Sequence, residues 1–160
     1  MDKSISIEQI GEISSKIHQQ NKRIVLLGGC FDILHIGHIV FLEEAKKQAD
    51  ILIVLIESDE TITASKGPKR PINSQDERAK ILAALSVVDY VIVLKPNMDN
   101  KAYDDLVIAL KPAIIATTSG DINRHHKERQ AELVDAKVID VTTPITDKST
   151  TRLIRMLDEL

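Results

Sequence analysis

The residues best able to do chemistry lie between positions 28 and 38, a segment with the sequence Gly-Gly-Cys-Phe-Asp-Ile-Leu-His-Ile-Gly-His. His35 and His38 are three residues apart at the start of a predicted helix, so their side chains can face the same direction. The helix end itself favours anions, because its N–H groups are free and its dipole is positive there. Gly28 and Gly29 let a ligand approach the backbone closely. The segment therefore predicts a site for phosphate oxygens.

Other interpretations of this segment are open at the level of sequence. One histidine could cap the helix while the other packs against the body of the protein. Alternatively, His35 and His38 could bind a metal ion with Asp32 as a third ligand, although no further ligand has an obvious spacing. Gly37, between the two histidines, keeps the local surface low.

Cationic candidates lie in or beside the polar stretch 61–73, which contains one glycine and two prolines and is predicted to be a loop. Lys66 and Arg70 belong to this stretch, and cations on a loop can close over phosphates and withdraw to release product. A solvated surface charge is the alternative for each of them. Arg78 lies in the first turns of the following helix, where either a phosphate contact or a surface or dimer salt bridge is expected.

Small hydroxyl side chains mark a further candidate site near the end of the chain. Ser149, Thr150 and Thr151 lie at another predicted helix start, where hydroxyls and free N–H groups suit phosphate, with simple capping as the alternative. Asp121 follows a predicted strand and could cap the next helix. The residues at 125–127, His-His-Lys, are predicted to form a solvated helix face, with acceptor binding as the alternative.

Short apolar runs and amphipathic segments alternate along the chain and must position these side chains. The predicted strands are Arg23–Leu27, Ile51–Ile56, Tyr90–Leu94, Ala113–Ala116 and Lys137–Val141. The predicted helices are 7–17, 37–47, 74–85, 102–110, 123–135 and 151–160, and Ser6 with Gln9 and Ser74 with Glu77 form capping boxes. This alternation predicts an α/β fold: a Rossmann-like, doubly wound, five-stranded parallel sheet with helices on both faces.

The predicted fold brings the candidate residues together. In such sheets ligands bind beyond the carboxyl ends of the strands, where the strand order reverses. The segments that should meet there are 28–38, 57–70, 117–121 and 143–151. We expect a single domain overall, in which residues 1–20 form an N-terminal helix and residues 21–160 form the α/β domain that carries the candidate site.

Composition excludes several classes of function. The chain has 160 residues, of which 43% are hydrophobic and 28% charged, as in an ordinary globular protein. A net charge of -3 and an aromatic content of 2% argue against nucleic acid or membrane partners. The single cysteine, Cys30, cannot form an internal disulfide, and no secretory or membrane-spanning pattern occurs. We therefore expect a cytoplasmic protein.

The segment ending at His38 resembles the signature G-x-F-D-x-x-H-x-G-H of the cytidylyltransferase-like nucleotidyltransferases. The resemblance extends to the stretches 66–73, 77–79 and 83–90, which are similar to the adenylyltransferase half of bifunctional heptose-phosphate kinase/adenylyltransferases. Glycerol-3-phosphate cytidylyltransferases share much of the same pattern.

This resemblance implies an enzyme in which a substrate phosphate attacks the α-phosphorus of a nucleoside triphosphate and pyrophosphate leaves. His35, His38 and Lys66 would then be catalytic, and Arg70 and Arg78 would contact the acceptor or its phosphate. The residues implied in nucleotide binding are Gly28, Gly29, Cys30, Phe31, Asp32, Gly37, Gly120, Asp121, Ser149, Thr150 and Thr151. The resemblance also implies Mg²⁺ brought with the nucleotide, no metal site made by the protein alone, and a homodimer.

Three departures bear on the substrate. Thr118 stands where the heptose branch has a lysine, and Ile122 replaces its aromatic residue. The stretch 144–148 lacks the arginine that the glycerol-phosphate branch carries there. We predict transfer of AMP from ATP to a phosphorylated acceptor such as a heptose 1-phosphate. The alternatives are a CTP-dependent glycerol-3-phosphate enzyme and a non-catalytic nucleotide-binding regulatory module; a dehydrogenase would need a G-x-G-x-x-G turn, which the chain lacks.

Overall fold

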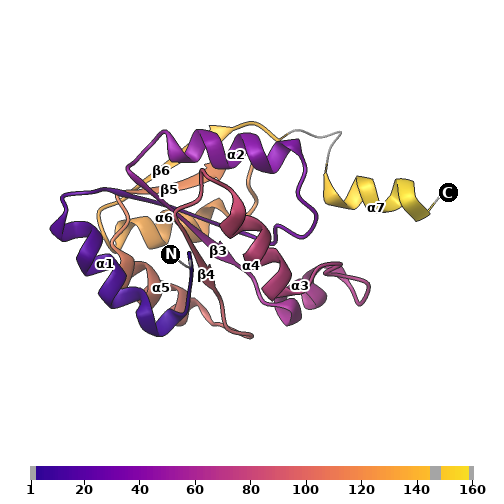
Figure 1. Cartoon of the computed structure of the whole chain (residues 1–160), viewed down its shortest axis with the longest axis horizontal. Coiled ribbons are helices and arrows are strands. Elements are labelled where there is room, and N and C mark those ends of the chain that lie inside the picture. Colours follow the sequence, from indigo (N-terminus) through magenta and orange to yellow (C-terminus); the bar gives the residue numbers. More distant parts are fainter. Residues whose placement is uncertain (1–2, 145–148, 159–160) are drawn as a thin grey trace.

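The computed structural model describes residues 3–144 and 149–158, and within them six strands form one parallel sheet flanked by helices (Figure 1). The strands are β1 (Ser4–Ile5), β2 (Ile24–Gly29), β3 (Ile51–Ile56), β4 (Tyr90–Val93), β5 (Ile114–Thr118) and β6 (Lys137–Thr142). The helices are η1 (Ile7–Gln9), α1 (Ile10–Gln19), α2 (Ile36–Lys46), α3 (Asp59–Lys66), α4 (Gln75–Ala84), α5 (Asn100–Leu110), α6 (Arg124–Glu132) and α7 (Thr150–Asp158).

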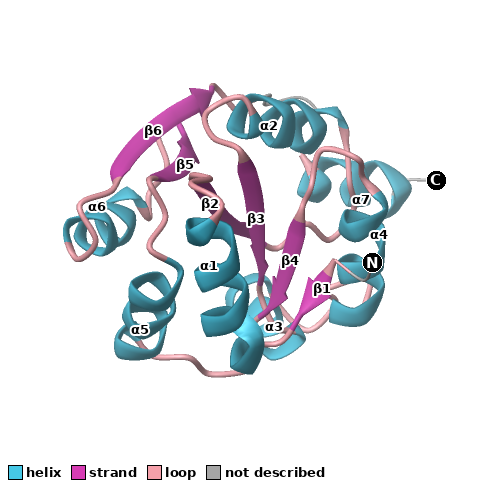
Figure 2. Cartoon of the chain, turned by 60° about the vertical axis from the view of Figure 1, so that its left-hand side comes forward, coloured by secondary structure: helices cyan, strands magenta, loops and turns pink. Residues whose placement is uncertain are grey.

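The central strands are continuous apolar runs because helices cover both faces of the sheet. Successive residues of a strand point to opposite faces. Leu26 and Ile53 accordingly pack with residues of α1, α5 and α6, whereas Leu27 and Val54 pack with residues of α2 and α4. Figure 2 shows α1 and α5 on one side of the sheet and α2 on the other. The core is therefore two apolar layers separated by the sheet.

The strand order places a topological switch point beside β2. The order is β1-β4-β3-β2-β5-β6, so β2 pairs with β3 on one side and with β5 on the other. The chain runs outward from β2 to β4 and then crosses back to β5, and a ligand crevice is expected beyond the carboxyl ends where this reversal occurs. The segments 28–38, 57–70 and 117–121 all follow strands at that edge, as predicted.

The structure confirms the fold class, the predicted strands and both capping boxes. The N–H of Ser6 donates to Oε1 of Gln9 at 2.8 Å, and the N–H of Ser74 donates to Oε2 of Glu77 at 2.8 Å. Among the described residues, no helix has the length and apolar character needed to cross a membrane.

Two structural predictions are wrong. The sheet has a sixth strand in the described chain, β1, whose pairing of Ser4 with Val91 adds an edge next to β4. The stretch predicted as a loop begins inside a helix, α3, because Ser58 caps it by accepting the N–H of Thr61 at 3.1 Å. That helix ends at Gly67, whose φ of 95° lies in the region that favours glycine.

Candidate active site

The segment 28–38, called the motif turn below, joins β2 to α2 and holds its two histidines by backbone contacts. Nδ1 of His35 accepts the N–H of Gly37 at 3.1 Å, and Nδ1 of His38 accepts the N–H of His35 at 3.4 Å. Because each Nδ1 is an acceptor, we assign the proton of each neutral ring to Nε2. The ring centroids are 3.9 Å apart, so the two side chains lie together at the helix start, as the spacing predicts.

Both imidazoles are held in the neutral form. Burial, and then the neighbouring His35, lower the pKa of His38 to about 4, and burial also lowers the pKa of His35. At neutral pH each ring therefore presents one N–H group, on Nε2. The capping interpretation is correct for His35, but it uses Nδ1 and leaves the Nε2 donor available. The arrangement can donate two hydrogen bonds to phosphate oxygens at a helix end that already favours anions.

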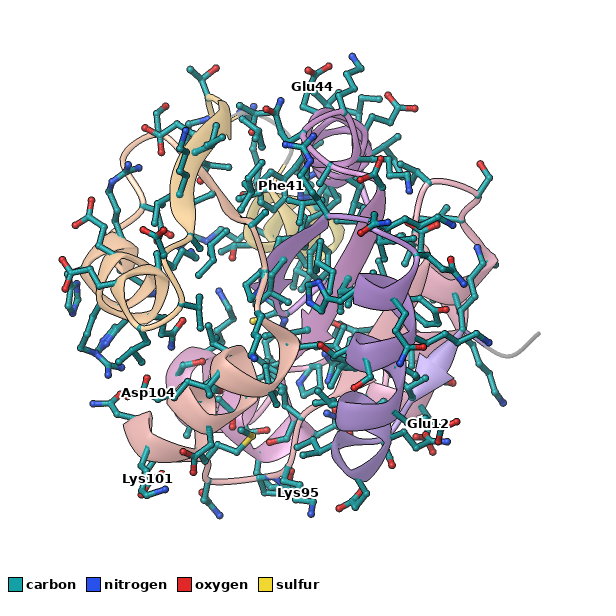
Figure 3. The ribbon with its side chains drawn as sticks, turned by 90° about the vertical axis from the view of Figure 1, so that its left-hand side faces the viewer. Glu12, Phe41, Glu44, Lys95, Lys101 and Asp104 are labelled. Atoms are coloured by element: carbon teal, nitrogen blue, oxygen red, sulfur yellow. The ribbon has the colours of Figure 1, made fainter. Side chains whose placement is uncertain are left out.

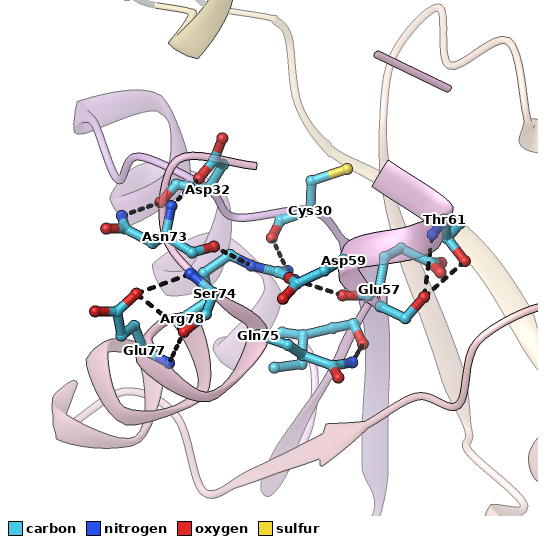
Figure 4. Close-up of polar contacts among 12 residues, drawn as sticks. Cys30, Asp32, Glu57, Asp59, Thr61, Asn73, Ser74, Gln75, Glu77 and Arg78 are labelled. Atoms are coloured by element: carbon cyan, nitrogen blue, oxygen red, sulfur yellow. Dashed lines mark hydrogen bonds and ion pairs between the residues drawn. The ribbon is translucent and has the colours of Figure 1, made fainter. Parts of the chain in front are cut away.

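Asp32 fastens the motif turn to the segment that precedes α4. Its buried carboxylate accepts the N–H groups of Ile72 and Asn73, each at 2.9 Å, and Nε of Arg70 at 2.6 Å. The side chain of Asn73 in turn donates to the Asp32 main-chain oxygen at 2.7 Å, and both residues are visible in Figure 4. Burial alone would raise the pKa of Asp32, but these hydrogen bonds lower it overall. Arg70 thus contacts Asp32 and does not line the neighbouring pocket described below.

The alternative of a metal site at the motif turn is not supported. Asp32 would have been the third ligand beside His35 and His38, and its carboxylate is instead bound to the segment before α4. In the part of the chain that the structure describes, no group of three or more His, Cys, Asp or Glu side chains is arranged to hold a metal ion.

Arg78 connects three segments around the site from inside the protein (Figure 4). Its fully buried guanidinium donates to the main-chain oxygens of Cys30 and Glu57, each at 2.7 Å, and of Asn73 at 3.1 Å. It also forms an ion pair with Asp59 at 2.8 Å. The prediction of a phosphate contact, or of a surface or dimer salt bridge, is therefore wrong. The side chain is enclosed and its donors are used to fix loops.

Gly29 leaves little room for a side chain in the motif turn. A Cβ added to Gly29 would lie 3.0 Å from the ring of Phe31, which is tighter than ordinary contacts. Phe31 itself has a φ of 48°, an uncommon conformation for a bulky residue. The buried ring lies 5.3 Å from that of His38, centroid to centroid, and so supports the histidine. The two residues together shape the turn on which the imidazoles stand.

The start of α7 lies against the motif turn. The hydroxyl of Thr150 donates to the main-chain oxygen of Ile33 at 3.0 Å, a contact between residues far apart in sequence. Ser149 caps the helix, because its Oγ accepts the N–H of Arg152 at 3.2 Å. The helix starts of α2 and α7 are therefore neighbours, and both suit anions. Residues 145–148, which belong to the predicted segment 143–151, lie outside the described residues.

A pocket of about 610 Å³ opens beside the motif turn, beyond the carboxyl ends of β2 and β3. Its lining is Leu26, Leu27, Gly28, Gly29, Cys30, Leu55, Glu57, Thr61, Ile62, Ser65, Lys66, Asn100, Tyr103, Ile115, Ile122, Asn123, His126, Lys127 and Gln130. The volume lies in the range of small-molecule sites. Of the sequence candidates, Gly28, Gly29, Cys30 and Lys66 line this pocket.

The two histidines, Asp32, the motif-turn residues after Cys30 and the start of α7 are not part of this lining. They form a second group around the start of α2. The candidate site therefore has two compartments that meet at Gly29 and Cys30: a phosphate-binding corner and an adjoining pocket.

Sequence reasoning missed the acidic and aromatic part of the pocket. The Tyr103 hydroxyl donates toward Oε2 and Oε1 of Glu57, at 2.8 and 3.0 Å. Burial raises the pKa of Glu57 and also that of Tyr103, beyond the range in which a tyrosine usually ionises. Glu57 directly follows a buried strand at the sheet edge where ligands bind, and that position was a usable signal. For Tyr103 the sequence offers none.

A cluster of hydrogen bonds around Asp121 fixes two residues of the pocket lining, Asn123 and Lys127. Asp121 accepts hydrogen bonds from Lys127, from the Thr117 hydroxyl at 2.6 Å and from the N–H of Asn123 at 2.9 Å. Burial would raise the pKa of Asp121, but these donors, Lys127 above all, lower it to about 2. The predicted solvated helix face at 125–127 fits His125, which is exposed. The prediction is wrong for His126 and Lys127, which line the pocket.

Gly120 and Asp121 do not themselves line the pocket. Gly120 is exposed, with a φ of 77°, and provides the turn after β5. Asp121 acts through Lys127 and Thr117, so its contribution to the site is to hold neighbouring side chains.

An open parallel α/β sheet with a paired-imidazole anion site and a small-molecule pocket at its switch point is the architecture of a nucleotide-binding enzyme. The cytidylyltransferase-like family matches residues 26–156. The chain belongs to this family.

Two bifunctional HldE proteins are similar to nearly the whole chain. The bifunctional protein HldE of Aliarcobacter butzleri is 36% identical over 154 residues, which are 96% of this chain and 31% of that protein. HldE of a Nitratiruptor species is 38% identical over 151 residues, 94% of this chain and 31% of that protein. The chain thus spans about a third of the length of these curated relatives.

Solved structures agree on the fold. A lipopolysaccharide core biosynthesis protein from Thermoplasma volcanium is 30% identical with a TM-score of 0.62, covering 77% of this chain and 97% of that one. A pantoate-beta-alanine ligase from Francisella tularensis has a TM-score of 0.61 at 17% identity, covering 90% of this chain and 68% of that one, which is a likeness of fold alone.

Proposed function

We propose that this protein transfers AMP from ATP to a heptose 1-phosphate and releases pyrophosphate. The observation that carries the proposal is the pair of neutral imidazoles at the start of α2, each with Nε2 available as a donor. The identity to the HldE proteins, over nearly the whole chain, favours the heptose phosphate as acceptor.

In the proposed reaction, a phosphate oxygen of the acceptor attacks the α-phosphorus of ATP. The bond from the α-phosphorus to the bridging oxygen breaks, and pyrophosphate leaves with that electron pair. No covalent enzyme intermediate forms, so the protein contributes position and charge stabilisation. His35 and His38 would donate to oxygens whose charge grows as pyrophosphate separates. Neutral donors suit this role because they are already oriented when the charge develops.

The remaining phosphate contacts would come from three places around the motif turn. Lys66 lines the pocket near the end of α3, immediately before Gly67, and would bridge the acceptor phosphate and the nucleotide. Ser149 and Thr151, at the start of α7, would bind the triphosphate through hydroxyls and free N–H groups. Thr150 is buried and holds α7 against the turn, so its role would be to position the others.

Mg²⁺ suits this proposal only as a partner of the nucleotide. Among the described residues that line the pocket, Glu57 is the carboxylate, and it already accepts the Tyr103 hydroxyl. Mg²⁺ in such sites keeps waters and takes substrate phosphates as ligands, so the triphosphate would supply most of its coordination. When bound, it would neutralise phosphate charge. We further propose that the reaction takes place in the cytoplasm, where ATP and Mg²⁺ are available, and that the chain acts as a homodimer.

The test is a matrix of pyrophosphate release. ATP and CTP are each combined with heptose 1-phosphate and with glycerol 3-phosphate, in the presence of Mg²⁺, using the wild-type chain and His38→Ala. We expect turnover with ATP and heptose 1-phosphate and its loss in the variant. Turnover only with CTP and glycerol 3-phosphate would replace this proposal with the glycerol-phosphate reaction, and binding of ATP without any turnover would favour a regulatory module.

A further inference from the structure

The pocket is larger than a phosphate site needs, and one of its walls carries no assigned role. This wall, called the helical wall below, consists of the pocket-lining side chains of α5 and α6 with the residue before α6: Asn100, Tyr103, Asn123, His126, Lys127 and Gln130. The two helices are tied together, because Arg129 of α6 forms an ion pair with Asp104 of α5, which is labelled in Figure 3. The wall is thus a fixed surface rich in hydrogen-bonding groups.

Glu57 faces this wall with acceptor capacity to spare. Its carboxylate has two oxygens with about four lone-pair directions, and the Tyr103 hydroxyl supplies a single hydrogen. The Arg78 guanidinium contacts the main-chain oxygen of Glu57 rather than its carboxylate. In the empty pocket water can fill the remaining acceptor positions, and a bound ligand with hydrogen-bond donors can replace that water. The hydroxyls of a polyol or sugar are donors of this kind.

We propose that Glu57 and Tyr103 form a specificity-determining pair that binds the hydroxyl groups of the acceptor. This inference rests on the proposed nucleotidyl transfer and adds to it the residues that recognise the acceptor, whose neighbouring hydroxyls would be held between β3 and the helical wall. Glu57 accepts hydrogen bonds from these hydroxyls, and Tyr103 fixes the carboxylate in place.

The geometry of phosphoryl transfer assigns this pocket to the acceptor rather than to the nucleotide. The attacking and leaving oxygens lie roughly in line on opposite sides of the phosphorus. The donors for the leaving pyrophosphate, His35 and His38, lie on the α2 side of the motif turn. The pocket is lined by Gly29 and Lys66 but by neither histidine, so we assign it to the acceptor.

Kinetics of conservative variants test the inference. Tyr103→Phe removes only the hydroxyl, and Glu57→Gln keeps the size of the side chain while removing its charge. Each should raise KM for heptose 1-phosphate by about ten- to a hundredfold, the effect of losing a hydrogen bond to a charged group, while KM for ATP stays within about twofold. The preference for heptose 1-phosphate over glycerol 3-phosphate should fall by a similar factor in Glu57→Gln, because the site no longer rewards additional hydroxyls.

Matched controls are present in the chain. Tyr90→Phe changes the tyrosine of β4, and Glu60→Gln changes an exposed glutamate of α3; neither residue lines the pocket. Both controls should leave the two KM values unchanged. If ATP KM rises as much as acceptor KM in Tyr103→Phe and Glu57→Gln, the pair belongs to the nucleotide and the inference is wrong.

Calorimetry separates this inference from the proposed reaction. If the wild-type chain releases no pyrophosphate with any acceptor, the proposed function fails, and the binding of heptose 1-phosphate then decides the inference alone. Binding to the wild type that weakens about tenfold or more in Tyr103→Phe supports the hydroxyl-binding pair. Absence of binding, or equal binding to both proteins, overturns it.

Discussion

The motif turn and the helical wall border one site but are built by different means. In the motif turn, the contacts that orient the imidazoles span two or three residues, as from Gly37 to His35 and from His35 to His38. Across the pocket, Tyr103 reaches Glu57 over 46 residues of sequence. The imidazoles are therefore oriented locally, although Asp32 and Cys30 anchor the turn to distant segments. The wall exists only after the sheet and helices have assembled. In the proposed function, the chemistry would belong to the local part and the choice of acceptor to the assembled part.

The strongest test removes Arg78, which joins the motif turn at Cys30 to the end of β3 at Glu57, the residue that faces the helical wall. Arg78→Met should lower the free energy of unfolding by about 3–5 kcal/mol, because it leaves buried carbonyl acceptors and Asp59 without their partner. Urea unfolding measures the change. Arg23→Met, which removes an exposed arginine 4.0 Å from Asp50, is the control and should cost less than about 1 kcal/mol. A similar small effect for both variants would mean that Arg78 does not hold the loops together.

On the motif turn itself, His38→Ala should reduce kcat by about a hundred- to a thousandfold. This factor corresponds to a loss of roughly 3–4 kcal/mol of transition-state stabilisation, as expected when a hydrogen-bond donor to the developing charge is removed. His35→Ala should behave similarly. Folding should be retained, as judged by circular dichroism and thermal unfolding. His125→Ala changes an exposed histidine outside the pocket lining and should be neutral. Near-normal turnover in a well-folded His38→Ala protein would remove the imidazole pair from the mechanism.

At the border between the two parts, Lys66→Ala should lower kcat/KM by about ten- to a hundredfold through loss of a charged contact to phosphate. Both lysines are exposed, but Lys66 lines the pocket and Lys69 does not, so Lys69→Ala should have a much smaller effect. Initial rates at varied acceptor concentration compare the two variants. Equal small losses would identify both lysines as solvated charges.

The same contrast explains what the sequence could predict. Continuous apolar runs identify β2 to β5, because a doubly covered parallel sheet buries both faces of a strand. β6 lies at the edge of the sheet and is only partly buried. β1 was missed because Ser4–Ile5 is too short for any periodicity and owes its pairing to β4. α3 was missed because the glycine and prolines that follow it suggest a loop, while its cap at Ser58 lies outside the stretch considered.

Within the site, the residues of the motif turn could be predicted because their types and spacing carry the chemistry in one short string. Arg78 and Lys127 could not be placed, since a helical cation looks alike whether it is exposed, enclosed or directed to a pocket. Only the packed structure shows that Arg78 is enclosed and that Lys127 faces the pocket. Contacts between distant elements, such as that of Tyr103 with Glu57, leave no local pattern to interpret.

A smaller effect should appear in the pH dependence of stability. Burial lowers the pKa of His38 to about 4 from an ordinary value of 6.5. Between these values the unfolded chain binds a proton at this position that the folded chain does not, so the free energy of unfolding falls as the pH falls through this window. Urea unfolding at about pH 7 and about pH 5 should therefore show a smaller decline for His38→Asn than for the wild type. Asp32 and the other acidic groups are common to both proteins, so parallel declines would contradict the burial of a neutral His38.

The smallest expected effect concerns the base of the nucleotide. We predict that ATP binds more tightly than CTP, by about 1–2 kcal/mol, the range that a hydrogen bond or two to the base edge supplies. The stretch from Lys66 to Tyr90 resembles the adenylyl-transferring branch, and the HldE relatives match nearly the whole chain. The stretch 144–148, which lies mostly outside the described residues, also lacks the arginine of the cytidylyl-transferring branch.

Calorimetric titration of ATP and of CTP, each with Mg²⁺, measures this preference directly. It should be unchanged in Tyr103→Phe, because the helical wall is assigned to the acceptor and the nucleotide to the motif-turn side. That independence makes the base preference a further check on the two compartments. A preference that shifts toward CTP in Tyr103→Phe would place the base against the helical wall and reverse the two assignments. Tighter binding of CTP by the wild type, with turnover of glycerol 3-phosphate, would instead leave the compartments intact and replace the substrates.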